Sequence, residues 1–207
     1  SWYVDRTFDW GSSSPFSVNW WAESDGTTAP NGITYPRGTM FAIGEWYGWN
    51  GQPNEGCKLL AHEIADGIIE REHQGLLQTL IINDGAADTQ IWQADPLIGI
   101  SIADEMAERG VSWLKADKTP GSRKQGWQRL RRFLKASHKF PMEEAGLFIF
   151  NNCTHWIRTV PVLPRSDKDR DDVDSLAEDH AGDSTRYRLS YALPAIGSFE
   201  SGLPSAI

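Results

Sequence analysis

Hydrophobic positions follow different spacings in different parts of the chain. Near its start, aromatic and β-branched runs are separated by short segments rich in Gly, Ser and Pro, which is typical of antiparallel strands joined by turns. We expect three such strands within residues 2–10, 16–22 and 38–49. The spacing then changes to steps of three and four residues, which predicts a helix from Asn54 to about His73.

Short apolar runs alternate with helical stretches in the rest of the chain. We expect helices over residues 96–110 and 121–137. The apolar runs at 79–83, 111–116 and 146–150 are typical of short strands, and the first of them predicts a buried strand. A meander followed by alternating helices and strands predicts an α/β fold with a mixed sheet covered by helices.

Composition favours one globular domain. The chain has 207 residues, of which 40% are hydrophobic and ten are Trp, so it can bury a substantial core. We assign residues 1–191 to this domain and residues 192–207, which lack periodicity, to a C-terminal tail. No apolar run is long enough for a membrane span, so we expect no membrane partner. The two Cys lie outside any CxxC spacing, which argues against a disulfide framework and a zinc site.

Charge is distributed unevenly. The net charge of −8 speaks against a polyanionic partner, yet residues 115–139 contain nine basic residues and one acid. Such a concentration within an acidic protein indicates a phosphate-binding face, and the Gly-Ser turn that opens the basic helix offers free backbone N–H groups. The candidate contacts are Lys115, Lys118, Ser122, Arg123, Lys124 and Arg129.

Several acidic residues occupy positions that packing alone does not favour. Asp9 lies inside an aromatic strand, where an unpaired buried carboxylate costs several kcal/mol. Asp88 follows the expected strand 79–83 in a Gly- and Ala-rich turn. Asp179 and Asp183 are four residues apart on an expected helix, where like charges repel unless a cation lies nearby.

These carboxylates have two interpretations. Asp9 could pair with Arg6 or cap the following turn, Asp88 could cap a short helical turn at 89–92, and Asp183 could lie on a solvated helix face. Alternatively, carboxylates from a strand, a strand end and a helix supply the oxygen ligands that Mg²⁺ or Mn²⁺ prefers, and His180 lies on the same helical side as Asp183.

Taken in order, several motifs resemble the nuclease domain of the large terminase subunit of tailed bacteriophages. The resemblance spans nearly the whole chain, and its last motif is the most specific. The matching pieces are RTFDWGSSSPFSVNWW (6–21), GAADTQIW (85–92), WLKADKTPGSRKQGWQRLR (113–131), and GLFIFNNCTHWIRTVPVLP leading into DDVDSLAEDHAGDSTRY (146–187).

The resemblance implies an RNase H-like fold and a two-metal endonuclease that cuts concatemeric viral DNA with Mg²⁺ or Mn²⁺. Carried over to this chain, the metal ligands are Asp9, Asp88 and Asp183, and His180 is the assisting group of the DHxxD pattern. Asp84 lies nearer the end of the expected strand 79–83 and is the alternative to Asp88.

The same resemblance implies a biological setting. The substrate is double-stranded DNA, and the full-length protein would carry an ATPase motor domain and work with a small terminase subunit and a portal in the host cell cytoplasm. Two other functions stay open from the sequence. The chain could be another RNase H-like DNA enzyme, such as a resolvase or transposase core, or a portal-docking module whose nuclease activity is suppressed.

Overall fold

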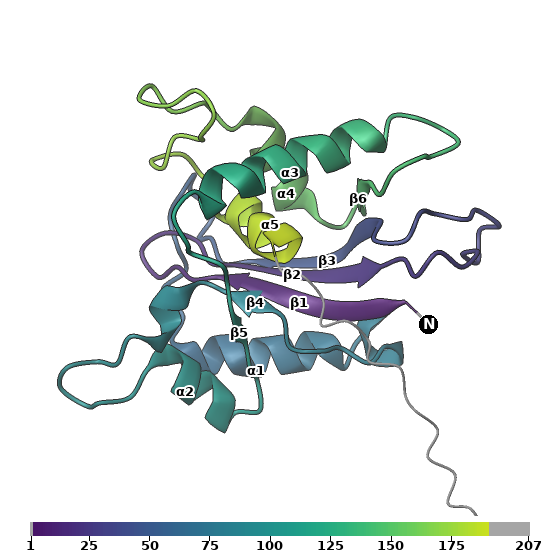
Figure 1. Cartoon of the computed structure of the whole chain (residues 1–207). Coiled ribbons are helices and arrows are strands. Elements are labelled where there is room, and N and C mark those ends of the chain that lie inside the picture. The colour runs from purple at the N-terminus through teal and green to yellow at the C-terminus, as the bar shows by residue number, and fades with distance from the viewer. Residues whose placement is uncertain (1, 191–207) are drawn as a thin grey trace, which may run out of the picture.

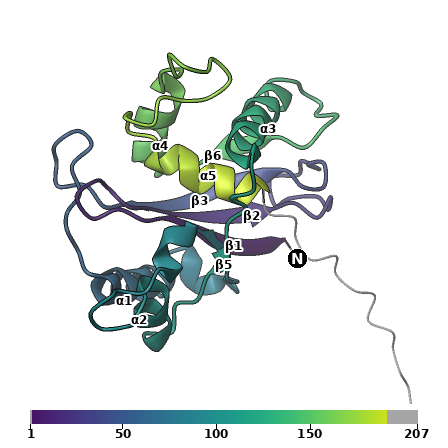
Figure 2. The ribbon, with the colours of Figure 1, turned by 60° about the vertical axis from the view of Figure 1, so that its left-hand side comes forward.

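A mixed β-sheet forms the centre of the molecule and carries helices on both faces (Figures 1 and 2). The computed structural model describes residues 2–190, so the predicted tail 192–207 lies outside the described residues. The six strands lie in the order β5-β4-β1-β2-β3-β6. Their bounds are β1 Tyr3–Asp9, β2 Ser17–Glu23, β3 Met40–Tyr47, β4 Ala86–Ala87, β5 Leu114–Lys115 and β6 Leu147–Ile149.

The first three strands form the predicted antiparallel meander. β1 pairs with β2, and β2 with β3, while short strands β4 and β6 add parallel neighbours on the two sides. Aromatic and β-branched residues fill these strands and favour the extended conformation. The predicted α/β class, a mixed sheet with an antiparallel meander and parallel strands flanked by helices, is confirmed.

Helices cover the two faces unequally. One face carries α1 Ala61–Glu72 and α2 Ile102–Glu108, and the other carries α3 Ser122–Ala136, α4 Thr154–Thr159 and α5 His180–Ser190 (Figure 1). Helix α5 packs against β1, β2, α3 and α4. It is buried along most of its length, which explains why it lacks a clear amphipathic pattern. No helix within residues 2–190 has the length and apolar character needed to cross a membrane.

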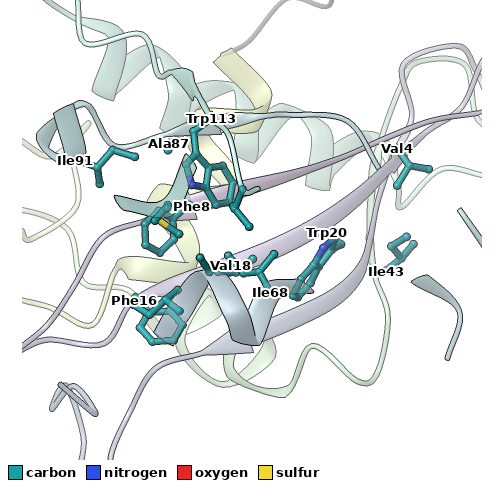
Figure 3. Packing of buried hydrophobic residues seen from close by; sticks show 14 of the residues in the cluster. Val4, Phe8, Phe16, Val18, Trp20, Ile43, Ile68, Ala87, Ile91 and Trp113 are labelled. Carbon is teal, nitrogen blue, oxygen red and sulfur yellow. The ribbon is translucent and has the colours of Figure 1, made fainter. Parts of the chain in front are cut away.

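Each face of the sheet has its own core. Beneath α1 the core contains Phe8, Phe16, Trp20 and Ile68, with Phe8 stacked on Trp113 at a ring separation of 5.2 Å (Figure 3). On the other face, aromatic and aliphatic side chains of β2, α3 and α4 form a second cluster, which includes Trp21, Trp127, Leu130 and Trp156. The sheet is therefore apolar on both faces except along β1 and the start of β2, where polar residues are also buried.

The prediction of a buried strand at 79–83 is wrong. Residues Leu77–Thr79 form a 3₁₀ turn, Ile81 is 87% exposed, and only Asn83 makes an isolated parallel bridge to β1. The parallel strand is instead β4, two alanines of the GAAD motif. Small residues are required there because a Cβ on Gly85 would lie 1.9 Å from the carbonyl oxygen of Arg6.

Several predicted elements are shorter than their hydrophobic patterns indicated. The helix expected from Asn54 begins at Ala61, where the Glu63 side chain accepts a hydrogen bond from the Leu60 N–H. The helix expected over 96–110 begins after Ser101, which forms a capping box with Asp104. The residues before that cap form an exposed loop, and the strand expected over 111–116 is reduced to two residues.

Helices α3 and α5 cross at glycines. A Cβ on Gly126 of α3 would lie 2.0 Å from Cγ of Arg186, and one on Gly182 of α5 would lie 2.7 Å from Cη2 of Trp127. The absence of side chains at these positions lets the two helices approach closely. This approach brings the N-terminal ends of α3 and α5 together.

We expect Gly182→Ala to lower the free energy of unfolding by about 1–3 kcal/mol, because the new methyl group overlaps the Trp127 ring. Alanine is otherwise the better helix former, so helix propensity opposes this loss. Urea denaturation followed by Trp fluorescence measures the change, and Gln128→Ala on the exposed face of α3 is the control. An unchanged or raised midpoint for Gly182→Ala would contradict the close packing.

Candidate active site

Three polar contacts join one face of β1 to α5. Asp5 accepts a hydrogen bond from Nε of Arg188 at 2.8 Å, the Thr7 and Ser184 hydroxyl oxygens lie 2.8 Å apart, and Asp9 lies 3.1 Å from Nδ1 of His180. Two residues of a strand advance by about 6.6 Å and four residues of a helix by about 6 Å. Every second residue of β1 can therefore contact every fourth residue of α5. This β1–α5 ladder explains how β1 buries two carboxylates.

Asp9 lies at the carboxyl end of β1 and is 6% exposed. Its Oδ1 accepts a hydrogen bond from the Tyr187 hydroxyl at 3.1 Å. Burial raises the pKa of Asp9, and the negative charges of Asp183 and Asp88 raise it further, against the lowering effect of His180. The buried position and the neighbouring carboxylates thus disfavour the ionised form of Asp9.

Asp88 follows β4, which runs parallel to β1 and is directly paired with it. Its backbone N–H donates to the carbonyl oxygen of Phe8 at 3.0 Å, which places Asp88 beside the end of β1. Its Oδ1 caps the 3₁₀ turn Thr89–Trp92 by accepting from the Gln90 N–H, as one interpretation of the sequence predicted. Its Oδ2 accepts from the Tyr187 hydroxyl at 3.1 Å and lies 3.3 Å from Nζ of Lys118. The Tyr187 hydroxyl therefore lies between Asp9 and Asp88, and its single hydrogen is shared by the two carboxylates.

Asp183 and Asp179 share one cation. The guanidinium of Arg123 lies 2.9 Å from a carboxylate oxygen of each, and its Nε donates to Asp172 at 2.9 Å. Asp183 also accepts from Nε of Arg186 at 3.2 Å. The like charges that the sequence places four residues apart are thus neutralised by the protein itself, and Asp183, at 8% exposure, does not lie on a solvated helix face.

His180 uses both ring nitrogens within the protein. Nδ1 faces Asp9, and Nε2 lies 3.0 Å from Oδ1 of Asn54. Burial alone would lower the pKa of His180, but the hydrogen bond and charge of Asp9, with the charges of Asp179 and Asp183, raise it. The ring is thereby fixed between two oxygen atoms.

Comparison with known structures identifies this arrangement of strands and helices. The large terminase from a thermophilic bacteriophage matches 90% of this chain with a TM-score of 0.59 and 13% identity, and the P22 large terminase nuclease domain matches 91% with a TM-score of 0.62 and 16% identity. The chain has the terminase nuclease fold. It spans 38% of the thermophilic phage protein and 80% of the P22 domain. No protein-family model and no curated protein sequence matches it.

Within this terminase nuclease fold, the structure separates Asp84 from the other predicted ligands. Asp9, Asp88, Asp183 and His180 converge, whereas Asp84 pairs with Arg6 at 3.3 Å and its side chain is 48% exposed. Arg6 also binds Glu72 at the end of α1. The geometry favours Asp88 over Asp84 as a neighbour of Asp9, and Asp9 does not pair with Arg6.

The predicted phosphate contacts are largely engaged with acidic groups. Besides Arg123, Lys124 forms an ion pair with Asp169 and Lys118 contacts Asp88 and Tyr187. The remaining candidates are placed differently: Ser122 is buried, Arg129 is exposed and donates to the Leu189 carbonyl oxygen, and Lys115 lies over the Trp92 ring.

Tyr187 belongs to this site and was missed from the sequence, whereas Arg186, expected as a partner of Asp179, pairs with Asp183. Tyr187 lies four residues after Asp183 and seven after His180, so all three occupy neighbouring turns on one side of α5. That spacing could have identified Tyr187 as a site residue from the sequence. Burial and the nearby negative charges of Asp9, Asp183 and Asp88 raise the pKa of Tyr187, so it stays a neutral hydrogen-bond donor to the carboxylates.

The carboxylate oxygens of this site are the ligand type that a hard divalent cation prefers. Asp9, Asp88 and Asp183 offer only oxygen atoms, and burial together with the charges of Asp183 and Asp88 raises the pKa of Asp9, as expected where a cation is needed. Within residues 2–190, no three His, Cys, Asp or Glu side chains stand close enough to form a ready metal cage. The carboxylate oxygens are instead engaged by Tyr187 and Arg123.

We expect Arg123→Gln to lower the free energy of unfolding by about 1–2 kcal/mol at pH 8, a value reduced for the 30% exposure of the side chain, because three carboxylates lose their shared cation. Burial and the charge of Asp183 raise the pKa of Asp179 to about 6, against the lowering effect of Arg123. Protonation of Asp179 at pH 5 removes one of the three negative charges that Arg123 offsets, so the loss should shrink there.

Denaturant unfolding at the two pH values measures this dependence. Arg132→Gln, which removes an exposed pair with Glu144, should leave the midpoint unchanged at both. A loss for Arg123→Gln that is equal at pH 5 and pH 8 would contradict a role in neutralising the carboxylates.

Proposed function

We propose that the chain is a metal-dependent DNA endonuclease that cleaves concatemeric viral DNA during genome packaging. The observation that carries the proposal is the convergence of Asp9, Asp88 and Asp183, which come from β1, the end of β4 and α5 and are all buried at the carboxyl ends of these two strands. The likeness to the P22 large terminase nuclease domain supports it.

The three carboxylates would hold two divalent cations, Mg²⁺ or Mn²⁺. When bound, such ions activate a water for in-line attack on a phosphodiester and stabilise the departing 3′ oxygen. The contribution of the chain would be to hold these carboxylates near one another, and they would exchange their bonds to Tyr187 and Arg123 for the metals. The internal cations that now neutralise these carboxylates, Arg123 and Lys118, would then be free to face phosphate.

His180 acts on the reaction through Asp9 in this scheme. Both of its ring nitrogens have protein partners, so neither is free to donate a proton to the leaving oxygen. We therefore propose that His180 orients the Asp9 carboxylate. Tyr187 has a similar role, since its hydroxyl contacts both carboxylates and so fixes the distance between Asp9 and Asp88.

The outer face of α3 is a further candidate for DNA contacts. Arg131 and Lys135 are exposed, and within residues 2–190 their side chains form no ion pair. They lie one helical turn apart, so they present two positive charges side by side. Contacts of this kind read the phosphate backbone rather than the base sequence and weaken with salt.

The wider setting is part of the same proposal. The chain spans only 38% of the large terminase from the thermophilic phage, so an ATPase motor domain, a small terminase subunit and a portal would be partners of a longer protein. The place of action would be the host cell cytoplasm. Comparing the cleavage of linear duplex with that of branched DNA distinguishes this proposal from a resolvase or transposase core.

We expect Asp9→Asn, Asp88→Asn and Asp183→Asn each to reduce cleavage of supercoiled plasmid at least about 100-fold in Mg²⁺ or Mn²⁺, because each removes a charged ligand. Asp84→Asn is the matched control and should cut like the parent. Circular dichroism first verifies that each variant is folded. Cutting that survives in Asp88→Asn and disappears in Asp84→Asn would exchange their roles, and a folded parent that cuts DNA with neither metal would refute the proposal.

We expect the double variant Arg131→Glu/Lys135→Glu to bind duplex DNA at least about tenfold more weakly at low salt, with a shallower dependence of affinity on salt concentration. Fluorescence anisotropy with a labelled duplex measures both quantities. Arg109→Glu reverses a charge after α2, on the opposite face of the sheet. Arg109→Glu changes the net charge by −2 and the double variant by −4, so a loss in binding free energy half as large in Arg109→Glu would show an effect of net charge rather than a binding face.

A further inference from the structure

Asn54 contacts the active-site histidine from a loop far away in the sequence. Its Oδ1 lies 3.0 Å from Nε2 of His180, on the side of the ring opposite Asp9. Asn54, His180 and Asp9 therefore form a line of three side chains, drawn from a loop, from the start of α5 and from the end of β1. The acidic and histidine motifs of the sequence give no indication of this contact.

The loop that carries Asn54 is held by bonds of its own. Trp49 and Gly56 form an antiparallel bridge, and the backbone N–H of Asn50 donates to the carbonyl oxygen of Glu55 at 3.0 Å. The N–H of Gly56 donates to the carbonyl oxygen of Ser13 at 2.7 Å, which ties the loop to the β1–β2 turn. None of these bonds uses the Asn54 side chain.

The backbone of Asn54 has a left-handed conformation, with φ of 58°. Residues other than Gly adopt this conformation at a cost, although Asn tolerates it better than most. Glycine would suit the backbone better, but it would lack the amide that reaches His180. The use of Asn here is consistent with a role for its side chain.

The second contact of the amide settles its orientation. Nδ2 of Asn54 donates to the carbonyl oxygen of Leu176 at 3.4 Å, which leaves Oδ1 facing His180. An oxygen acceptor requires a hydrogen on Nε2, because two acceptors cannot bond to each other. Asn54 thus requires a proton on Nε2, and by the same rule the ionised Asp9 carboxylate requires one on Nδ1, so the ring donates from both nitrogens.

We propose that Asn54 is a positioning residue, which fixes the ring of His180 and through it the carboxylate of Asp9. The inference rests on the proposed nuclease function for its effect on the rate, but the contact itself does not. It resembles the way in which a hydrogen-bond partner behind a histidine sets the orientation of the ring in metal sites.

Two variants test the inference. Asn54→Gly removes the amide at a backbone position that favours glycine, so the loop should keep its shape. Asn54→Asp keeps an oxygen acceptor beside Nε2 and serves as the conservative replacement. Lys58→Gly is the matched control, because Lys58 is exposed and has a left-handed backbone with φ of 59°.

The first measurement is the NMR signal of the Nε2–H proton of His180, recorded without metal and assigned with His180→Gln. It should be visible in the parent, Lys58→Gly and Asn54→Asp, and lost to solvent exchange in Asn54→Gly. The melting temperatures of Asn54→Gly and Lys58→Gly should stay within about 2 °C of the parent. A protected proton in Asn54→Gly would overturn the inference.

The second measurement is steady-state plasmid cleavage. In Asn54→Gly we expect kcat to fall about tenfold and KM to change less than twofold, with most of kcat restored in Asn54→Asp. Loss of the ring signal with an unchanged kcat would show a contact without a positioning role. If the folded parent does not cut DNA, the proposed function fails, and the ring signal alone decides whether Asn54 fixes the imidazole.

Discussion

The buried polar ladder between β1 and α5 is the constraint on which the rest of the structure depends. A central strand that buries Asp5, Thr7 and Asp9 is unstable unless each has a partner. Helix α5 supplies Arg188, Ser184 and His180 at the matching spacing. A shift of β1 by one residue would turn all three polar side chains toward the aromatic core beneath α1. The same contacts that fix the register of the sheet thus place Asp9 beside the other carboxylates.

Helix α3 has two chemically distinct faces. Its inner face approaches α5 at glycines and directs Arg123 to three acidic residues, while its outer face leaves Arg131 and Lys135 in solvent. The strongly basic segment of the sequence therefore serves two purposes. Part of its charge neutralises the acidic edge of the sheet within the protein, and only the remainder faces outward.

The sequence predicted those parts of the fold and site that depend on local pattern. The meander, α3 and β6 follow from hydrophobic spacing, and the motifs brought the site carboxylates and the histidine into one hypothesis. The prediction of a strand at 79–83 was wrong because hydrophobicity does not report how closely a backbone must approach the neighbouring strand. The segment beside β1 is instead formed by Gly85, where a side chain would clash with Arg6, and the two alanines of β4. The partners of charged residues were also beyond local pattern, since the contacts of Arg123 lie 49 to 60 residues further along the chain and those of Asp9 lie on α5. Such pairings arise only when distant elements pack, so they leave no trace in spacing or composition.

The separation of the site residues along the chain bears on when the site comes into existence. Asp9 is on the first strand, and His180, its partner, is 171 residues away. During synthesis β1 leaves the ribosome long before α5 does, so the carboxylate of Asp9 has no histidine and no opposing Asp183 until nearly all of the described chain has emerged. An incomplete chain therefore lacks the assembled site, which, under the proposed function, would keep a nascent polypeptide from cutting DNA.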